Sequence, residues 1–271
     1  MNKLPSSTYM AALAITDTGF LILLFFTWLQ QAGISSVVSY PWCQIIVFST
    51  YVFSFLSVWF VVLFMIERYI AVCYPLKALQ LCTKKRARLS TVIISVLAML
   101  LYSHSFWTTF DRQGMCEMRA EFFIFLTIMT YVDTVATFIV PFTAILVMNL
   151  RIIFAVRDVK RRSHWLQELQ PRTSAHHTSL SKTQMKLTKS LVIVSSVFLM
   201  LVLPSHANRF YALISVHFLS SGLNRPLEIA QHLMQFLYYL TFVINILLYA
   251  ATSHMFRKGT SEICKKIKRI L

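Results

Sequence analysis

Charged residues are scarce in this sequence, and acidic ones are the scarcest. Only 13% of its 271 residues are charged, with 10 Asp and Glu against 26 Lys and Arg, while 57% are hydrophobic. A soluble domain carries about 25% charged residues, so this composition excludes an ordinary soluble protein. The sequence also lacks a nucleophile elbow, metal-ligand spacing and a phosphate-binding loop, which argues against an enzyme. We therefore expect an all-α integral membrane protein.

Six apolar segments each reach the roughly 20 residues that a helical membrane span needs. They cover approximately residues 9–29, 41–72, 89–110, 122–153, 187–210 and 227–251. The first is predicted as a retained helix, because it lacks the basic front and cleavage site of a signal peptide and contains Asp17. The second has no Gly and no internal Pro, which predicts one tilted helix of roughly 48 Å.

Basic residues are concentrated in alternate connections between these segments. The loop after the second segment, the loop of residues 154–186 and the tail of residues 252–271 are strongly basic, whereas the opposite loops are close to neutral. The positive-inside rule places the basic connections in the cytoplasm, so both termini of the chain are predicted to be cytoplasmic. Because the membrane accounts for the basic excess, we predict no nucleic-acid partner.

The predicted orientation divides the five cysteines into two groups. Cys43 and Cys116 fall on the oxidising side, where a disulfide between them is the simplest interpretation and two free thiols are the alternative. Cys73, Cys82 and Cys264 face the cytosol and should stay reduced. Cys264 lies among Ile and Phe at helical spacing with Lys and Arg between them, which predicts a short amphipathic helix at the membrane interface and a palmitoylation site.

Several short patterns occur in one order along nearly the whole chain. They are Leu13-Ala14 before Asp17, Glu67-Arg68-Tyr69 followed by Pro75, Pro141 and Pro204 inside later helices, and Asn245 to Tyr249 near the end of the last. Together they resemble a rhodopsin-like G-protein-coupled receptor, and the stretches 6–9 and 55–77 are most similar to invertebrate neuropeptide receptors. The resemblance implies a plasma-membrane receptor that binds an extracellular peptide and transmits the signal to a heterotrimeric G protein.

Receptors of this family have seven membrane-spanning helices, and the stretch from Met1 to Thr8 resembles their first cytoplasmic loop. The resemblance therefore implies a rhodopsin-like bundle with six of the usual seven helices, the first being absent. Two alternatives stay open. One is an incomplete receptor that does not signal; the other is a six-span transporter or channel, for which the expected internal repeat or discontinuous helix is not visible in the sequence.

The resemblance assigns a sodium site to three polar residues inside the spans. Asp17, Ser57 and Asn245 match the family's sodium-binding cluster, and their carboxylate, hydroxyl and amide oxygens suit a hard cation. The alternative is an uncharged network of hydrogen bonds in the core. No cofactor other than this sodium ion is predicted.

The resemblance also places the coupling switch at Glu67-Arg68-Tyr69. Glu67 is expected to hold Arg68 at rest, and Arg68 is expected to meet the terminal helix of the G protein when the cytoplasmic helix ends separate. An interfacial ion pair without a switching role is the alternative. The resemblance adds four switch residues in the last two spans: Phe198, Pro204, Asn245 and Tyr249.

Five positions depart from the family pattern, and all of them lie on the moving parts. Gln184 and Lys186 stand where an acid would hold Arg68, and Asn149, Val202 and Ile246 replace the usual tyrosine, tryptophan and proline. These departures predict altered switching and higher basal activity in an unchanged fold.

Polar and aromatic residues in the outer halves of the spans predict a cup large enough for the end of a peptide. Thr50 and Tyr239 replace the acid of amine receptors and the lysine of light-sensing receptors, which disfavours those ligands. Asp133 suggests a cationic ligand group, with a hydrogen bond to a neighbouring helix as the alternative. The candidate ligand contacts are Gln44, Thr50, Tyr51, Asp133, His206, Asn208, Arg209, His232, Gln235 and Tyr238.

Overall fold

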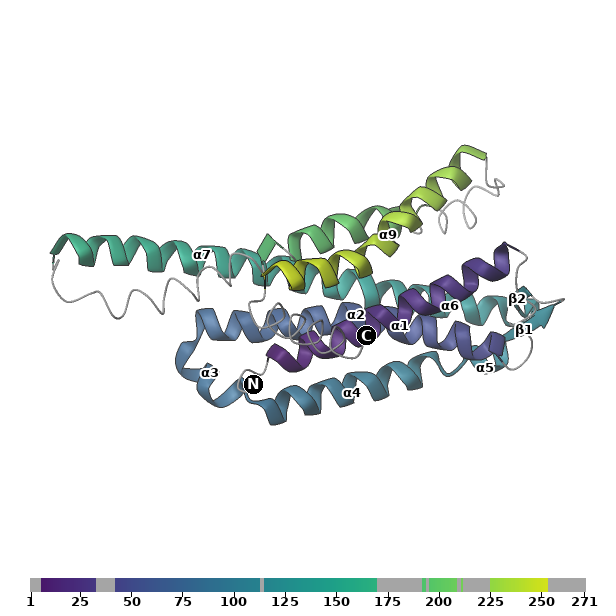
Figure 1. The fold of residues 1–271 in the computed structure, drawn as a ribbon, viewed down its shortest axis with the longest axis horizontal. Coiled ribbons are helices and arrows are strands. Elements are labelled where there is room, and N and C mark those ends of the chain that lie inside the picture. Colours follow the sequence, from purple (N-terminus) through teal and green to yellow (C-terminus); the bar gives the residue numbers. More distant parts are fainter. Residues whose placement is uncertain are drawn as a thin grey trace, which may run out of the picture.

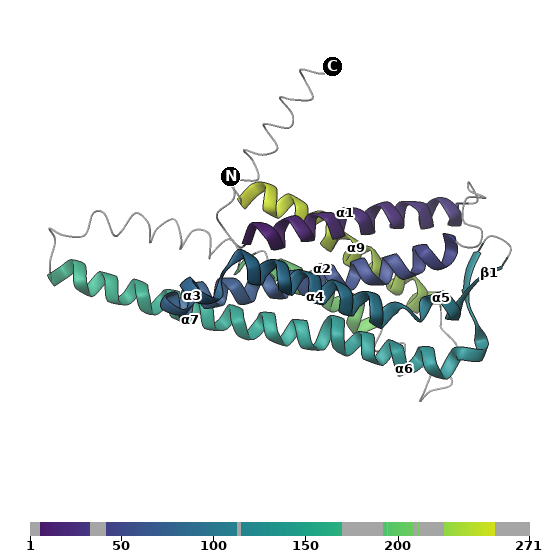
Figure 2. The ribbon, with the colours of Figure 1, turned by 90° about the horizontal axis from the view of Figure 1, so that it is seen from below.

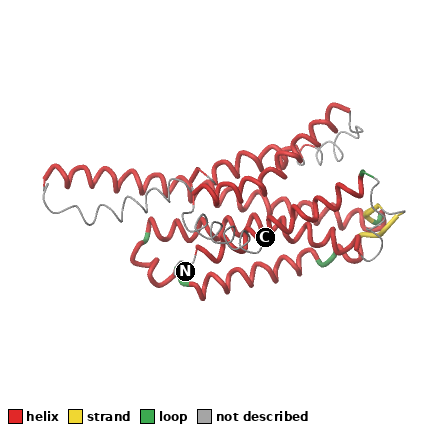
Figure 3. Tube along the Cα trace, viewed as in Figure 1, coloured by secondary structure: helices red, strands yellow, loops and turns green. Residues whose placement is uncertain are grey.

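The computed structural model of the chain describes residues 6–32, 42–112, 115–169, 192–193, 195–208, 211 and 225–252. These residues form a bundle of long helices with a short β-hairpin at one end (Figures 1 and 3). Within them, four helical stretches have the length and hydropathy of membrane spans: Ser7–Leu29, Trp42–Cys73, Lys84–Thr108 and Ala120–Asp158. The predicted C-terminal amphipathic helix and Cys264 lie outside the described residues.

Helix α2 (Trp42–Cys73) is the centre of the bundle and packs against α1 (Ser6–Gln31) and two later helices. Figure 2 shows α2 between α1 and α7. Its 32 residues correspond to roughly 48 Å of helix, as predicted. Because apolar residues recur on all sides of α2, it buries residues along its whole length, from Cys43 to Glu67.

The chain after α2 forms α3 (Pro75–Leu81) and then α4 (Lys84–Tyr102). Pro75 begins α3 at the first helical position, where its missing N–H is not needed. Thr83 caps α4, because its side-chain oxygen accepts a hydrogen bond from the backbone N–H of Arg86 at 3.4 Å. α3 lies at the end of the bundle opposite the hairpin (Figure 1).

The third predicted segment ends earlier as a helix than expected. α4 stops at Tyr102, a short helix α5 (Ser105–Thr108) follows, and the predicted helical residues Thr109 and Phe110 instead belong to strand β1 (Thr109–Arg112). β1 pairs antiparallel with β2 (Met115–Met118). Threonine and phenylalanine are favourable in strands, and this pairing satisfies their backbone groups.

The fourth predicted segment is one long helical path with a local irregularity. After a 3₁₀ turn, η1 (Ala120–Phe122), it consists of α6 (Phe123–Thr134), the π-helical turn η2 (Val135–Ile139) and α7 (Val140–Leu169). Pro141 lacks the N–H that would close the next turn. The Trp59 indole N–H of α2 donates to the Ala136 carbonyl at 3.0 Å and so binds α2 to this irregular turn.

The helix of the fourth predicted segment continues beyond its predicted end at residue 153. Residues 154–169 were expected to be loop but continue α7 as helix to Leu169, and α7 projects beyond the bundle at the end that carries α3 (Figure 1). The dense run of charged residues that begins at Arg157 marks the end of an apolar span, but Lys, Arg, Glu and Gln are good helix formers and do not end a helix. Of the two remaining predicted spans, the structure describes helical residues 195–208 and α9 (Arg225–Thr252).

Candidate functional site

The candidate residues lie at successive depths along α2. At 1.5 Å per residue, Thr50 and Ser54 lie roughly 11 and 17 Å along the helix from Cys43, Ser57 roughly 21 Å and Arg68 roughly 38 Å. A disulfide, a cavity, a polar core and an ion pair therefore follow one another on a single helix.

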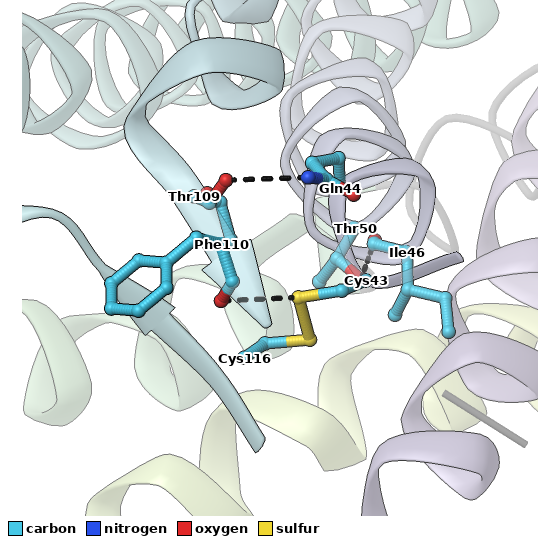
Figure 4. The surroundings of a disulfide bond; sticks show 7 residues. All are labelled: Cys43, Gln44, Ile46, Thr50, Thr109, Phe110 and Cys116. Atoms are coloured by element: carbon cyan, nitrogen blue, oxygen red, sulfur yellow. Dashed lines mark hydrogen bonds between the residues drawn. A yellow bond between two sulfur atoms is a disulfide. The ribbon is translucent and has the colours of Figure 1, made fainter. Parts of the chain in front are cut away.

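The predicted disulfide between Cys43 and Cys116 is present, with 5.7 Å between the two Cα atoms (Figure 4). It joins the start of α2 to β2 and holds the hairpin over that end of the helix. Gln44 adds a second connection, because its side-chain amide donates to the Thr109 carbonyl of β1 at 3.4 Å. Gln44 is 5% exposed, so it holds the hairpin in place and does not line the cavity described next.

A central cavity of about 100 Å³ lies between α1, α2, α6, η2, the helical segment 195–208 and α9. Six predicted ligand contacts share its wall: Thr50, Tyr51, Asp133, His206, Gln235 and Tyr238. The sequence reasoning missed five other lining residues: Phe20, Ser54, Thr137, Ser205 and Tyr239. Ser54 lies one helical turn after Thr50, so helical spacing would have found it. The cavity is smaller than the predicted cup, and the aromatic residues Phe20, Tyr51, Tyr238 and Tyr239 form part of its wall.

Hydrogen bonds and ring contacts fix several of these side chains. The Tyr102 hydroxyl of α4 donates to Asp133 Oδ1 at 2.5 Å. The sequence left such a bond to a neighbouring helix open as the alternative to a ligand contact for Asp133. The hydroxyls of Ser54 and Tyr238 are 2.5 Å apart. The His206 ring stacks on Phe138, with 4.6 Å between ring centroids. The cavity wall is therefore connected by side-chain contacts between separate helices.

The other predicted ligand contacts lie elsewhere. His232 lines a separate groove of about 750 Å³ between α1 and α9, and Gln235 belongs to both sites. Asn208 is half-buried and, like His232, is outside the lining of the central cavity that the described residues form. Arg209 lies outside the described residues.

The structure brings Asp17, Ser57 and Asn245 together in the core, where all three are at most 2% exposed. The Ser57 hydroxyl donates to Asp17 Oδ1 at 2.6 Å, and the Asn245 amide N–H donates to Asp17 Oδ2 at 3.3 Å. Both oxygens of the carboxylate thus accept a hydrogen bond from a neighbouring helix. This network joins α1, α2 and α9 one turn deeper than the cavity.

Glu67 and Arg68 form an ion pair at the opposite end of α2 from the disulfide. Arg68 Nη2 lies 2.7 Å from Glu67 Oε1, and the two side chains are 13% and 7% exposed. The guanidinium also lies over the Phe64 ring, 5.6 Å from its centroid. Tyr69 is half-buried with its ring edge-on to that of Tyr74. The pair is therefore packed against protein on several sides.

The remaining predicted switch residues lie in the last two helical segments. Phe198 is 4% exposed and Pro204 is half-buried, whereas the side chain of Tyr249 lies outside the described residues. Asn149, one of the departures from the family pattern, is buried and accepts a hydrogen bond from the Ser195 hydroxyl at 3.0 Å. The positions Gln184 and Lys186 lie outside the described residues.

Comparison with known proteins gives this arrangement its context. The profile of the 7 transmembrane receptor (rhodopsin family) matches residues 1–249. The chain belongs to this receptor family. Its members are multi-pass membrane receptors and not enzymes, so the receptor fold predicted from the sequence is confirmed.

Two individual receptors are similar to the chain. The growth hormone secretagogue receptor type 1 of Oryctolagus cuniculus is 30% identical over 216 residues, which are 73% of this chain and 54% of that receptor. The sex peptide receptor of Drosophila melanogaster is 25% identical over 232 residues, which are 77% of this chain and 51% of that receptor. This rhodopsin-family chain therefore spans about half the length of each relative.

Proposed function

We propose that this rhodopsin-family chain binds an extracellular peptide and activates a heterotrimeric G protein. The observation that carries the proposal is the position of two sites on one helix. The central cavity with Asp133 lies near the disulfide end of α2, and the Glu67–Arg68 pair lies at its other end. The names of the two similar receptors support a peptide as the ligand class.

A ligand acts in this way only if it binds the open state more tightly than the closed one. In the closed state Glu67 holds Arg68, and separation of the helix ends would release the guanidinium to the G protein. A second surface, at the same end of the bundle as the Glu67–Arg68 pair, supports a G protein as the partner. Leu76 and Leu79 of α3 are 82% and 81% exposed, and adjacent exposed apolar residues favour contact with a protein.

The orientation that this function requires follows from charge. The basic connections predict that both termini of the chain, α3 and the Glu67–Arg68 pair are cytoplasmic, and that the hairpin is extracellular. The disulfide supports this placement, because disulfides persist on the oxidising side of a membrane. The plasma membrane is the location in which such a receptor meets a secreted peptide.

A sodium ion fits the Asp17 network as part of the same proposal. The carboxylate of Asp17 and the hydroxyl of Ser57 are oxygen ligands, and rotation of the Asn245 amide would turn its oxygen toward the site. Water would complete the coordination. A bound ion would hold α1, α2 and α9 together and so favour the closed state.

The sodium site predicts a specific ion effect on stability. The purified chain in lipid nanodiscs should melt at a higher temperature in sodium chloride than in choline chloride of equal ionic strength, since an ion that binds only the folded state stabilises it. Asp17→Asn should remove this difference, whereas Asp158→Asn, which changes an exposed carboxylate on α7, should retain it. A sodium effect that survives in Asp17→Asn would refute the site.

The receptor function is tested by signalling. Cells that express the chain, with calcium and cAMP reporters, should respond to at least one member of a library of amidated neuropeptides. The Asp133→Asn variant should weaken that response if the peptide carries a cationic contact group. Silence across the library with normal surface expression would favour a non-signalling chain, and peptide-independent ion flux would favour a channel.

A further inference from the structure

Tyr102 has no role in the sequence-based predictions, yet the structure places it directly behind the cavity. It is the last residue of α4 and is 2% exposed. Its ring stacks on Tyr51 of α2, with 5.4 Å between centroids and 9° between ring planes, and lies edge-on to Phe55 at 5.8 Å. These contacts on two sides leave the hydroxyl in one position.

That hydroxyl donates to Asp133 Oδ1 at 2.5 Å. Asp133 lines the cavity, whereas Tyr102 is not among its described lining residues, so the Tyr102 hydroxyl acts on the cavity through the carboxylate that it contacts. A carboxylate on a helix has several rotamers, and a hydrogen bond from a fixed hydroxyl selects one of them. The Tyr51–Tyr102 stack thus fixes the direction in which Asp133 presents its charge.

The size and lining of the cavity define the group that it accepts. Ligand pockets usually measure about 300–1,000 Å³, so a cavity of about 100 Å³ admits one side-chain end and not a peptide backbone. Its wall carries a carboxylate, several hydroxyls and the rings of Phe20, Tyr51 and Tyr239. A carboxylate favours a cation, aromatic faces also attract one, and no Lys or Arg is among the described lining residues.

We propose that Tyr102 is a positioning residue that orients Asp133 so that the central cavity selects one cationic group, a guanidinium or ammonium, of the ligand. The inference rests on the proposed peptide-receptor function and names the ligand chemistry that this site recognises. It makes selectivity between charged and neutral ligands depend on a residue that does not contact the ligand.

The test measures binding without signalling, on the full chain in nanodiscs. The probes are Nα-acetyl-L-argininamide, whose only charge is its guanidinium, and its neutral isostere Nα-acetyl-L-citrullinamide, called argininamide and citrullinamide below; both are titrated by thermal shift. Argininamide should raise the melting temperature and citrullinamide should not. Tyr102→Phe keeps the ring and removes the hydroxyl, and it should raise the half-saturating concentration of argininamide by about tenfold. Tyr131→Phe, which changes an exposed tyrosine of α6 that is not among the described lining residues of the cavity, should bind as the unmodified chain does.

A double-mutant cycle separates positioning from stability. Asp133→Asn should abolish the preference for argininamide, and adding Tyr102→Phe to it should change binding no further, because Tyr102 acts through the carboxylate. A purely structural Tyr102 would lower the melting temperature without ligand and leave the ratio of the two probe affinities unchanged. Equal binding of the two probes, or an unchanged ratio in Tyr102→Phe, would overturn the inference.

Failure of the inference and failure of the receptor function give different results. A chain that prefers argininamide through Tyr102 but stays silent to all peptides would keep the cation site and lose the signalling function. A chain that signals to a peptide while Tyr102→Phe leaves the probe ratio unchanged would keep the function and lose the positioning role.

Discussion

Arg68→Ala is expected to abolish G-protein activation by this chain while ligand binding is retained. If Arg68 contacts the G protein as proposed, it is a buried charged anchor of the kind that dominates interfaces. Truncating such an anchor costs about 2–4 kcal/mol, which corresponds to roughly 30- to 900-fold in affinity. The measurement is agonist-driven nucleotide exchange on purified G protein, with probe binding measured on the same preparation.

Arg68→Ala also breaks the ion pair with Glu67, so its effect on stability must be separated from its effect on coupling. Removing Arg68 takes away the 2.7 Å partner of a Glu67 side chain that is only 7% exposed. Breaking a buried pair in this way destabilises a protein by about 3–5 kcal/mol. Some loss of signalling would then reflect loss of folded receptor.

The double variant Glu67→Gln/Arg68→Ala separates the two effects. It removes the carboxylate charge together with the guanidinium, so it should recover much of the thermal stability but none of the coupling. Glu67→Gln alone should keep Arg68 and raise basal activity, because the closed state loses its ionic contact. Arg86→Ala, which changes an exposed cation in α4, is the matched control and should signal normally. Coupling that survives in the double variant would show that Arg68 is not the switch.

The sequence predicted best those features that are local to one segment or that follow from the charge of the loops. The uninterrupted helix α2 follows from its long apolar composition, and the Cys43–Cys116 pairing follows from the charge that orients the loops. The Glu67–Arg68 pair is equally local, because the residues are neighbours in the chain. The Asp17 network joins distant segments and came only from the family pattern.

The sequence could not predict features that depend on how helices meet. Tyr102 and Asp133 are 31 residues apart, and nothing in either segment indicates that their side chains touch. The volume of the cavity depends on which aromatic rings turn inward, which hydropathy does not encode. The extension of α7 was missed for another reason: apolar length defines a membrane span, whereas helix propensity continues through charged residues to Leu169.

Cys43→Ser is expected to lower both surface expression and thermal stability. The disulfide closes a loop with a sequence separation of 73, for which chain entropy predicts at most about 4.4 kcal/mol of stabilisation. The actual value should be smaller, because α2 and α4 within this loop remain inserted helices when tertiary packing is lost. The Gln44–Thr109 hydrogen bond also stays, so the hairpin keeps one connection to α2.

The cysteine variants together identify why surface expression and thermal stability fall. Cys116→Ser and the double variant Cys43→Ser/Cys116→Ser should resemble Cys43→Ser, since each lacks the same bond, while Cys73→Ser changes a cysteine that is free in the structure and should have little effect. A maleimide label should react with Cys43 and Cys116 of the unmodified chain only after reduction. If both react without reductant, the bond is absent from the mature protein. If only the single variants lose expression, an unpaired thiol and not the missing bond is the cause.

The same variants test whether the hairpin shapes the cavity. Thr50 and Tyr51 line the cavity about two helical turns after Cys43 on α2. The Tyr51 ring stacks on the Tyr102 ring and so helps to hold Tyr102 in place. If the disulfide fixes the start of α2 relative to α4, its loss should weaken argininamide binding as well as stability. If it fixes only the hairpin, stability should fall while the preference for argininamide over citrullinamide stays unchanged. The ratio of probe affinities in Cys43→Ser therefore measures how far the covalent constraint reaches into the bundle.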